Sequence, residues 1–311
     1  MPRTATTFFQ TRFFPQLPDV SYYGLPYTQI NPAFNRMLFE DDSTFQPALF
    51  RNELEGLSGE KILMSNENFV GQSLYLNYSN RTSIARRLHD AMPGATVILF
   101  LRNQSELLKS LYLISLQDHE TASLSEFIRF DPPEYTLQQY RLHPKVDLFD
   151  YAPLDTYHAS EYAAGYRYTQ LLELYTQLFP RVEVFLYEDF RKNPESVFRR
   201  LETVFETNLT DDVRNSLVTS PAINQGVNAR QANQLRRLNR WYHVLWNSRM
   251  GRAFFVRARR RILKNSGAGD PVTWKKEELE KLKLLFAADN KLLQERYPHI
   301  GLDKYAREYF L

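Results

Sequence analysis

The stretch TVILFL, residues 96–101, is an uninterrupted apolar run that continues directly into the polar residues RNQS at 102–105. A short apolar run with polar residues at its end is typical of a strand buried in a parallel sheet. Beyond the turn, Leu107, Leu111 and Ile114 recur at helical spacing, which predicts a helix with one apolar face. The stretch therefore predicts a strand, a turn and a helix in that order.

The same order recurs along the chain, at KILMS (61–65) and at VEVFL (182–186). A helix over 82–92 ends before Pro93-Gly94, which is a stop signal, and Asn193 followed by Pro194 is typical of a helix start. Repeated strand–helix units predict an α/β fold with a parallel sheet flanked by helices. The remaining expectations are loop and irregular helix over 17–59, and helices over 159–179, 194–205 and 276–297.

Length and composition bound the class of protein. With 311 residues, of which 43% are hydrophobic, the sequence predicts a single domain over 1–311 with an irregular insertion at about 130–157. No cysteine occurs, which excludes disulfides and thiol nucleophiles. No apolar run approaches the roughly 18 residues of a membrane span, and the N-terminus lacks the apolar region of a signal peptide. We expect a cytoplasmic protein, at most peripheral at the inner membrane surface.

Charge is unevenly distributed along the chain. Residues 213–269 contain twelve Arg or Lys and no Asp or Glu, although the whole chain has 39 basic and 36 acidic residues. A solvated helical surface normally mixes both signs, so this basic segment indicates a partner that carries negative charge. The candidates are a nucleotide, a polyanionic acceptor, an anionic lipid surface and nucleic acid.

The N-terminal residues MPRTATT form a short run of small hydroxyl side chains that opens onto the apolar, helix-forming run FFQTRFF at 8–14. Backbone N–H groups at such a helix start point to one place and favour an anion there. Arg3 adds a forked set of charged donors. The segment therefore predicts a phosphate or sulfate site, although an ordinary Thr-capped helix would have the same composition.

Ligands of parallel α/β sheets bind at the carboxyl ends of the strands, so the polar residues that follow each predicted strand are candidates for the site. Ser65, Asn66 and Glu67 follow the first strand and Arg102 follows the second. Ser110 lies eight residues beyond Arg102. The two side chains together would bind a second phosphate. After the third strand, Tyr187, Glu188 and Asp189 precede a helix, and we expect the two carboxylates to be structural.

Four of these stretches, in this order, resemble the PAPS-dependent sulfotransferases. PRTATT (2–7) is similar to the family's 5′-phosphosulfate loop, which usually has Lys and Gly where Arg3 and Ala5 stand. VILFLR (97–102) with Ser110 resembles the 3′-phosphate motif, FLYEDFRKNPE (185–195) a recurrent strand and turn, and AADNKLL (287–293) the last helix. The resemblance implies a three-layer, P-loop-NTPase-like fold. The family places an apolar strand immediately before the loop, so we expect that strand upstream of Met1.

The resemblance also implies an activity, the in-line transfer of the sulfuryl group of PAPS to a hydroxyl or amine without a required metal. We expect a saccharide or glycolipid acceptor, because Glu67 stands at the base position where many carbohydrate-acting members have Glu. His119 is a lesser candidate for the base. The implied nucleotide contacts come from Arg3, Thr4, Ala5, Thr6 and Thr7 for the 5′-phosphosulfate, from Arg102 and Ser110 for the 3′-phosphate, and from Asn228 and Arg230 in the basic segment.

Other functions remain open. A nucleotide kinase is disfavoured because no Gly-x-x-x-x-Gly-Lys-Ser/Thr loop is present. A nucleic-acid-binding protein would use the basic segment with Trp241 and Trp246. A catalytically inactive sulfotransferase-like scaffold is the third possibility. A further group of cations, Arg257, Arg259, Arg260 and Arg261, lies next to the apolar residues FFV at 254–256. This group would contact an anionic membrane or an acidic polysaccharide, or it would form a solvated helix face.

Overall fold

The computed structural model describes residues 3–24, 31–55, 60–71, 80–130, 161–220, 227–264 and 269–310. Contacts group these residues into two compact units. The first unit comprises Met1–Leu107, Arg167–Asn224 and Leu285–Leu311, and the second comprises Leu108–Tyr166 and Gln225–Leu284. The single domain that the sequence predicts is not tested by this grouping and stays a prediction.

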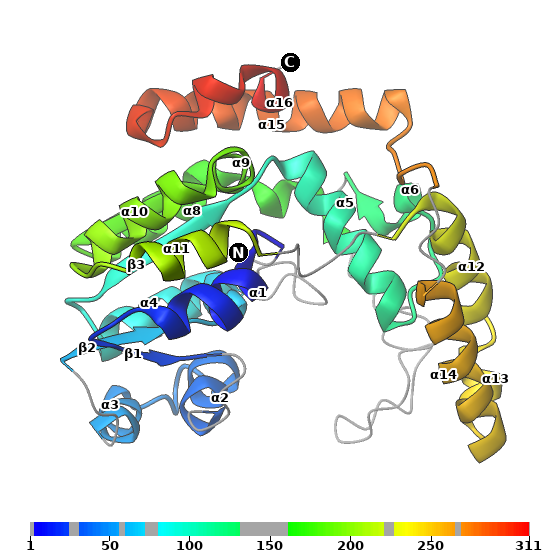
Figure 1. Ribbon diagram of the computed structural model, residues 1–311, viewed down its shortest axis with the longest axis horizontal. Helices are drawn as coiled ribbons and strands as arrows, with labels where there is room; N and C mark the ends of the chain where they lie inside the picture. The colour runs from blue at the N-terminus through cyan, green and yellow to red at the C-terminus, as the bar shows by residue number, and fades with distance from the viewer. Residues whose placement is uncertain are drawn as a thin grey trace. The chain divides into compact units, whose positions relative to one another are not determined.

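The first unit contains two pairs of parallel strands (Figure 1). Strand β1 (Val20–Tyr23) pairs with β2 (Lys61–Met64), and β3 (Thr96–Leu101) pairs with β6 (Arg181–Leu186). The β3–β6 register brings apolar residues together along both strands, and the last three residues of each strand are buried. Parallel pairing with connecting helices is the α/β arrangement that the sequence predicts.

The helices of the first unit precede, connect and follow its strands along the chain. They are α1 (Thr6–Phe8), α2 (Asn31–Phe39), α3 (Pro47–Glu55), α4 (Arg81–Ala91), α8 (Tyr168–Leu178), α9 (Tyr187–Lys192), α10 (Pro194–Phe205), α11 (Asp211–Val218) and α16 (Ala306–Tyr309). Two more, α5 (Gln104–Ser115) and α15 (Lys276–Arg296), extend from one unit into the other. The start of α10 confirms the predicted cap, since the Asn193 side chain accepts a hydrogen bond from the Ser196 N–H at 3.2 Å.

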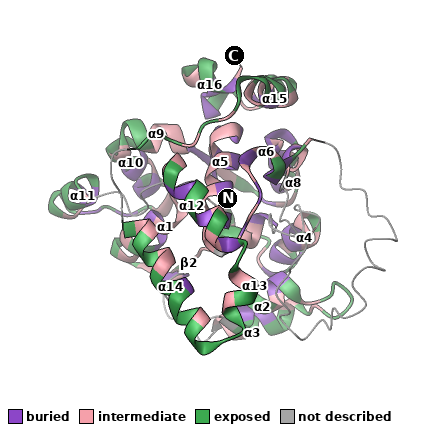
Figure 2. Cartoon of the chain, turned by 90° about the vertical axis from the view of Figure 1, so that its right-hand side faces the viewer, coloured by how far each residue is buried: buried purple, intermediate pink, exposed green. Residues whose placement is uncertain are grey.

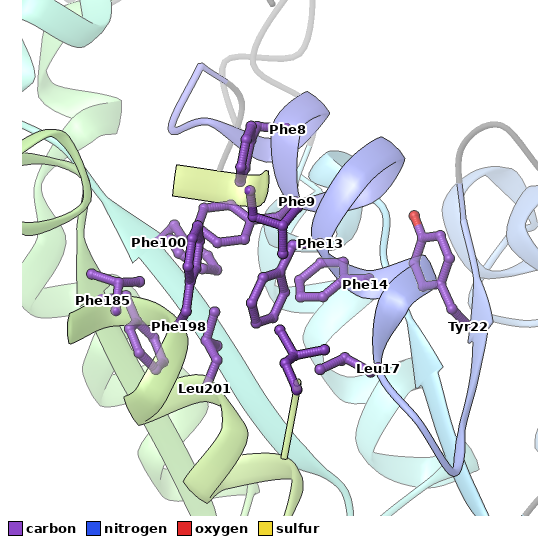
Figure 3. Close-up of a cluster of buried hydrophobic side chains, with 13 residues drawn as sticks. Phe8, Phe9, Phe13, Phe14, Leu17, Tyr22, Phe100, Phe185, Phe198 and Leu201 are labelled. Carbon is purple, nitrogen blue, oxygen red and sulfur yellow. The ribbon is translucent and has the colours of Figure 1, made fainter. Parts of the chain in front are cut away.

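An aromatic core fixes the N-terminal segment against the β3–β6 pair (Figure 3). Helix α1 continues as a wider π-helical turn over Phe9–Phe13, which sends successive rings into the core. The Phe9 ring lies 4.5 Å from that of Phe100 on β3, and the Phe13 ring stacks on Phe198 of α10 at 4.9 Å. Burial of each such ring contributes roughly 1.5–3 kcal/mol. The core therefore positions the loop that precedes α1.

A cavity of about 560 Å³ separates β2 from β3. Consecutive residues of both strands line it, from Lys61 to Met64 on one side and from Thr96 to Phe100 on the other. Among the described residues no strand joins the two pairs, so the continuous three-layer sheet expected from the sequence is not seen there. The mixed α/β class with parallel pairing is confirmed, and the P-loop-like detail stays a prediction.

The second unit is mainly helical. Its elements are α6 (Leu124–Phe127), the parallel strands β4 (Ile128–Arg129) and β5 (Glu161–Tyr162), and the helices α12 (Ala229–Asn239), α13 (Tyr242–Trp246) and α14 (Arg249–Lys264). The buried Asn239 side chain donates hydrogen bonds to the carbonyls of Leu116 and Glu120, at 2.9 and 2.8 Å. These bonds attach the end of α12 to the turn that follows α5. The predicted insertion at 130–157 lies outside the described residues except for Phe130.

Two predictions of local structure are wrong. The segment 17–59, expected to be loop and irregular helix, contains the regular helices α2 and α3 and the strand β1, which was not expected. The helix expected from residue 159 begins only at Tyr168, because the Asp289 carboxylate of α15 accepts the backbone N–H of Tyr168 at 2.7 Å and so caps α8 there. A cap supplied from 121 residues away leaves no local signal in the sequence.

Candidate functional site

The loop before α1 has an unusual backbone. Arg3 and Ala5 both adopt left-handed conformations, with φ of 61° and 63°, and Thr4 between them is fully buried. Left-handed residues are uncommon outside glycine and occur in backbone loops that bind anions. Ala5 therefore takes a conformation that glycine adopts at lower cost, although it carries a Cβ atom.

Arg102 follows β3 and reaches this loop. Its Nη1 donates a hydrogen bond to the Arg3 carbonyl at 3.0 Å, and its guanidinium lies over the Tyr187 ring, 4.4 Å from the centroid. Nη2 is 3.7 Å from the Glu106 carboxylate one helical turn away, while the buried Nε has no hydrogen-bond partner among the described residues. The sequence predicted that the loop and the end of this strand share one site, and the structure brings Arg3 and Arg102 together.

The two guanidinium groups repel each other at this place. Burial lowers the pKa of Arg3, and the positive charge of Arg102 lowers it further, whereas the charge of Glu67 acts in the opposite direction. Like charges in a partly desolvated position are unfavourable without an opposite charge between them. The arrangement therefore favours a bound anion.

The end of β2 supplies the carboxylate. Glu67 opens a short 3₁₀ helix (Glu67–Val70) whose start is capped by Asn66, because the Asn66 side chain accepts the Asn68 N–H at 2.9 Å. The exposed Glu67 carboxylate accepts a hydrogen bond from the Thr6 hydroxyl at 3.5 Å. A carboxylate beside the cationic loop is placed to take a proton from a hydroxyl group.

Gln10 holds the end of β2 against the N-terminal segment. Its side-chain Nε2 donates to the Ser65 carbonyl at 3.3 Å and to the Ser65 hydroxyl at 3.0 Å. Within the same N-terminal segment, the Thr7 carbonyl accepts a hydrogen bond from the Thr11 hydroxyl at 2.6 Å. The sequence predicted Ser65 at the site but missed Gln10, which lies in an apolar run and is buried.

The carboxylates that follow β6 belong to a structural network, as the sequence predicts. Glu188 accepts the Asn103 backbone N–H at 2.8 Å and the Tyr309 hydroxyl at 3.0 Å, and Asp189 accepts the Tyr305 hydroxyl at 2.7 Å. Burial raises the pKa of Glu188, although these hydrogen bonds act against the increase. The network fastens the C-terminal residues to the ends of β3 and β6.

Tyr187 is the site residue that sequence reasoning left without a role. It follows β6 directly, at the same register as Arg102 after β3, because Leu101 pairs with Leu186. Its ring therefore lies beneath the Arg102 guanidinium, where a cation and an aromatic face attract each other. The register of the two strands is the signal that would have found it.

The remaining predicted residues lie in the second unit. Ser110 is in α5, and Arg230 is an exposed residue in the first turn of α12. Asn228 caps α12, because its side chain accepts the Gln231 N–H at 2.9 Å and the Gln231 side chain accepts the Asn228 N–H at 3.0 Å. Their contact with a nucleotide stays a prediction.

His119, the lesser candidate for the base, packs in an aromatic cluster of the second unit. Its ring stacks on Tyr242 at 3.7 Å between centroids and lies 5.4 Å from the Phe255 ring. Its φ of 74° ends the turn after α5. The local surroundings of His119 indicate a packing role, whereas Glu67 is exposed beside the loop.

No family model and no curated protein matches the chain. A search of solved structures finds a similarity to a sulfotransferase from Alicyclobacillus acidocaldarius, with 19% sequence identity and a TM-score of 0.44. The similarity covers 85% of this chain and 91% of that chain. At this identity and TM-score it does not define the family, so the function is argued from the site.

Proposed function

We propose that this protein is a sulfotransferase that transfers the sulfuryl group of PAPS to a hydroxyl or amine of an acceptor. One observation carries the proposal. The Arg102 guanidinium at the end of β3 is hydrogen-bonded to the carbonyl of Arg3, in the left-handed loop before α1, and its charge lowers the pKa of the Arg3 side chain. The proposed site lies at the carboxyl ends of parallel strands.

The loop would hold the 5′-phosphosulfate. Backbone amides of residues 4–7 and the Arg3 guanidinium are the donors, and the left-handed Ala5 gives the loop its curvature. Arg102 would hold the 3′-phosphate through its forked donors. Tyr187 keeps the Arg102 side chain in place from below. The 3′-phosphate separates PAPS from ATP, so Arg102 would set the preference for the nucleotide.

The reaction is a direct transfer. The acceptor oxygen forms a bond to sulfur as the bond between sulfur and the 5′-phosphate oxygen breaks, which leaves PAP and a sulfated product. Glu67 takes the acceptor proton, a contribution of roughly 10²- to 10⁴-fold in rate. Arg3 offsets the negative charge that develops on the bridging oxygen. Positioning and charge stabilisation therefore account for the catalysis.

A saccharide or glycolipid is the acceptor that we propose. The support is chemical, since an exposed carboxylate next to a hydroxyl-lined loop suits a sugar hydroxyl, whose proton requires a base at neutral pH. Turnover with oligosaccharide and glycolipid acceptors, compared with a phenolic acceptor, tests this choice. Turnover with the phenolic acceptor alone would contradict it.

Nucleotide binding tests the donor site. We expect PAP to raise the melting temperature far more than AMP, because only PAP carries the 3′-phosphate. In Arg102→Ala this preference should disappear. The matched control is Arg199→Ala, which removes an exposed arginine of α10 that pairs with Glu195. An unchanged preference in Arg102→Ala removes the assignment of Arg102, and no response of the wild type to PAP removes the proposed function.

Glu67→Gln tests the base. We expect turnover to fall by about 10²-fold or more while PAP affinity stays unchanged, because the amide keeps the shape but cannot take the proton. Glu60→Gln, an exposed glutamate just before β2, is the control and should leave turnover unchanged. Near-normal turnover in Glu67→Gln would exclude this residue as the base.

A further inference from the structure

The helices α13 and α14 of the second unit expose an unusual set of apolar side chains. Met250 is 84% exposed and Phe254 is 59% exposed on α14, while Trp241 and Val244 are 62% and 66% exposed at α13. Scattered apolar residues are normal on protein surfaces, but a concentration in one short segment marks an interaction surface. Figure 2 shows that most of α14 is exposed.

Helix α14 has distinct inner and outer faces. Phe255 is the residue that anchors its inner face, because it is 1% exposed and its ring contacts those of Tyr242 and Trp246. On the outer side, residues 250, 254, 257 and 261 follow one another at spacings of four, three and four. Such residues form one stripe along a helix. The stripe combines Met250 and Phe254 with two exposed arginines, Arg257 and Arg261.

Further cations flank this stripe. A shallow hollow of about 370 Å³ on α14 is lined by three arginines and two apolar residues, which are Arg252, Arg257, Arg260, Ala253 and Val256. None of the ion pairs among the described residues involves these three arginines, and the sequence offers no acidic residue between 213 and 269. Like charges at such spacing destabilise an isolated helix, so the arrangement favours a partner with negative charge.

We propose that this outer face of α14, defined by Met250, Phe254, Arg257 and Arg261 and extended by the hollow beside it, binds the surface of an anionic lipid membrane. Apolar side chains among cations, without acids, are the composition of helices that lie in a bilayer interface. Met250 and Phe254 enter the acyl region, while the arginines bind lipid phosphates.

The aliphatic side chains decide between lipid and nucleic acid. Nucleic acids bind cationic surfaces through phosphates and through stacking of bases on aromatic rings. Met250 and Val244 offer no such ring, and they are more exposed than Phe254. Insertion into an apolar phase uses them, and base stacking does not. Among the described residues no helix is long and apolar enough to span a membrane.

Co-sedimentation of the full chain with vesicles tests the proposal. We expect binding to vesicles that contain phosphatidylglycerol and none to pure phosphatidylcholine, with binding reduced at high salt. The pairs Met250→Ser with Phe254→Ser, and Arg257→Glu with Arg261→Glu, should each lower the partition coefficient on the order of 10-fold or more. Lys291→Glu with Arg307→Glu changes the net charge equally at exposed positions of α15 and α16 and should have a small effect.

Three results would overturn the proposal: equal binding to both kinds of vesicle, unchanged binding of the Met250→Ser, Phe254→Ser variant, and an equal loss in the Lys291→Glu, Arg307→Glu control. Binding of single-stranded RNA that resists both serine substitutions and displaces the vesicles would assign the face to nucleic acid instead. Melting temperatures of the variants confirm that each is folded. The readout is independent of sulfuryl transfer, so the two proposals fail separately.

Discussion

Two groups of residues lie at the carboxyl ends of strands in the first unit and differ in how their charges are satisfied. At the end of β6, the partly buried Glu188 carboxylate accepts two hydrogen bonds, from Asn103 and Tyr309. In the loop before α1, Arg3 loses hydration and lies beside a second guanidinium, that of Arg102. The Glu188 carboxylate is held by hydrogen-bond donors of the chain, while the two guanidinium charges oppose each other although Glu67 and Glu106 lie nearby.

The backbone differs in the same way. Glu188 lies in the first turn of α9, a regular helix, whereas the loop holds Arg3 and Ala5 at positive φ. A folded chain retains unfavourable backbone and charge where surrounding contacts determine them, and such places are often binding sites. The comparison therefore indicates a structural role for the Glu188 network and supports the ligand-binding role that we propose for the loop.

Glu188→Ala should have the largest effect on stability. It leaves the buried Asn103 N–H and the Tyr309 hydroxyl without their acceptor, which we expect to cost about 3 kcal/mol. Urea unfolding at neutral pH measures the change. Glu195→Ala at an exposed site of α10 is the control, with an expected change below about 0.5 kcal/mol. A loss in Glu188→Ala as small as in the control would contradict a structural role.

The pH dependence of stability should identify Glu188 through its pKa. The pKa in the folded protein is raised above the ordinary value of 4.5, so the folded state holds the proton more tightly than the unfolded state. Protonation of Glu188 therefore stabilises the folded protein below pH 4.5. This stabilisation is lost as the pH rises through the pKa of Glu188 in the folded state. Glu188→Gln has no carboxyl group to titrate and should lack this loss. The difference in unfolding free energy between wild type and variant should therefore change with pH across that window. A pH-independent difference would show that the carboxyl does not titrate as the structure indicates.

Ala5→Gly should have the smallest effect on stability, and of opposite sign. A left-handed conformation costs a residue with a Cβ roughly 1–2 kcal/mol, whereas glycine loses about 0.5–1 kcal/mol through the entropy of the unfolded chain. We therefore expect a gain of about 0.5 kcal/mol in urea unfolding. Ala287→Gly within α15 should instead lose about 1 kcal/mol. Equal losses in both variants would show that Ala5 is not strained.

The sequence predicts the elements whose signals are local. The apolar run at 96–101 is a strand with the expected bounds, and Arg102 at its carboxyl end contacts Arg3 in the N-terminal loop. Strand β1 escapes prediction because it is only four residues long and becomes a strand through pairing with β2, about 40 residues later. Backbone conformations depend on tertiary contacts in the same way, so nothing in the composition of residues 2–7 indicates the left-handed Ala5.

A double-mutant cycle with Arg3→Ala and Arg102→Ala, with PAP affinity measured by calorimetry, tests the central claim most directly. If both side chains hold one nucleotide, their effects on PAP binding are coupled, and we expect a coupling energy above about 1 kcal/mol. The same cycle on unfolding of the ligand-free protein corrects for the contact between the two residues themselves. A PAP coupling within about 0.3 kcal/mol of zero after this correction would contradict the account.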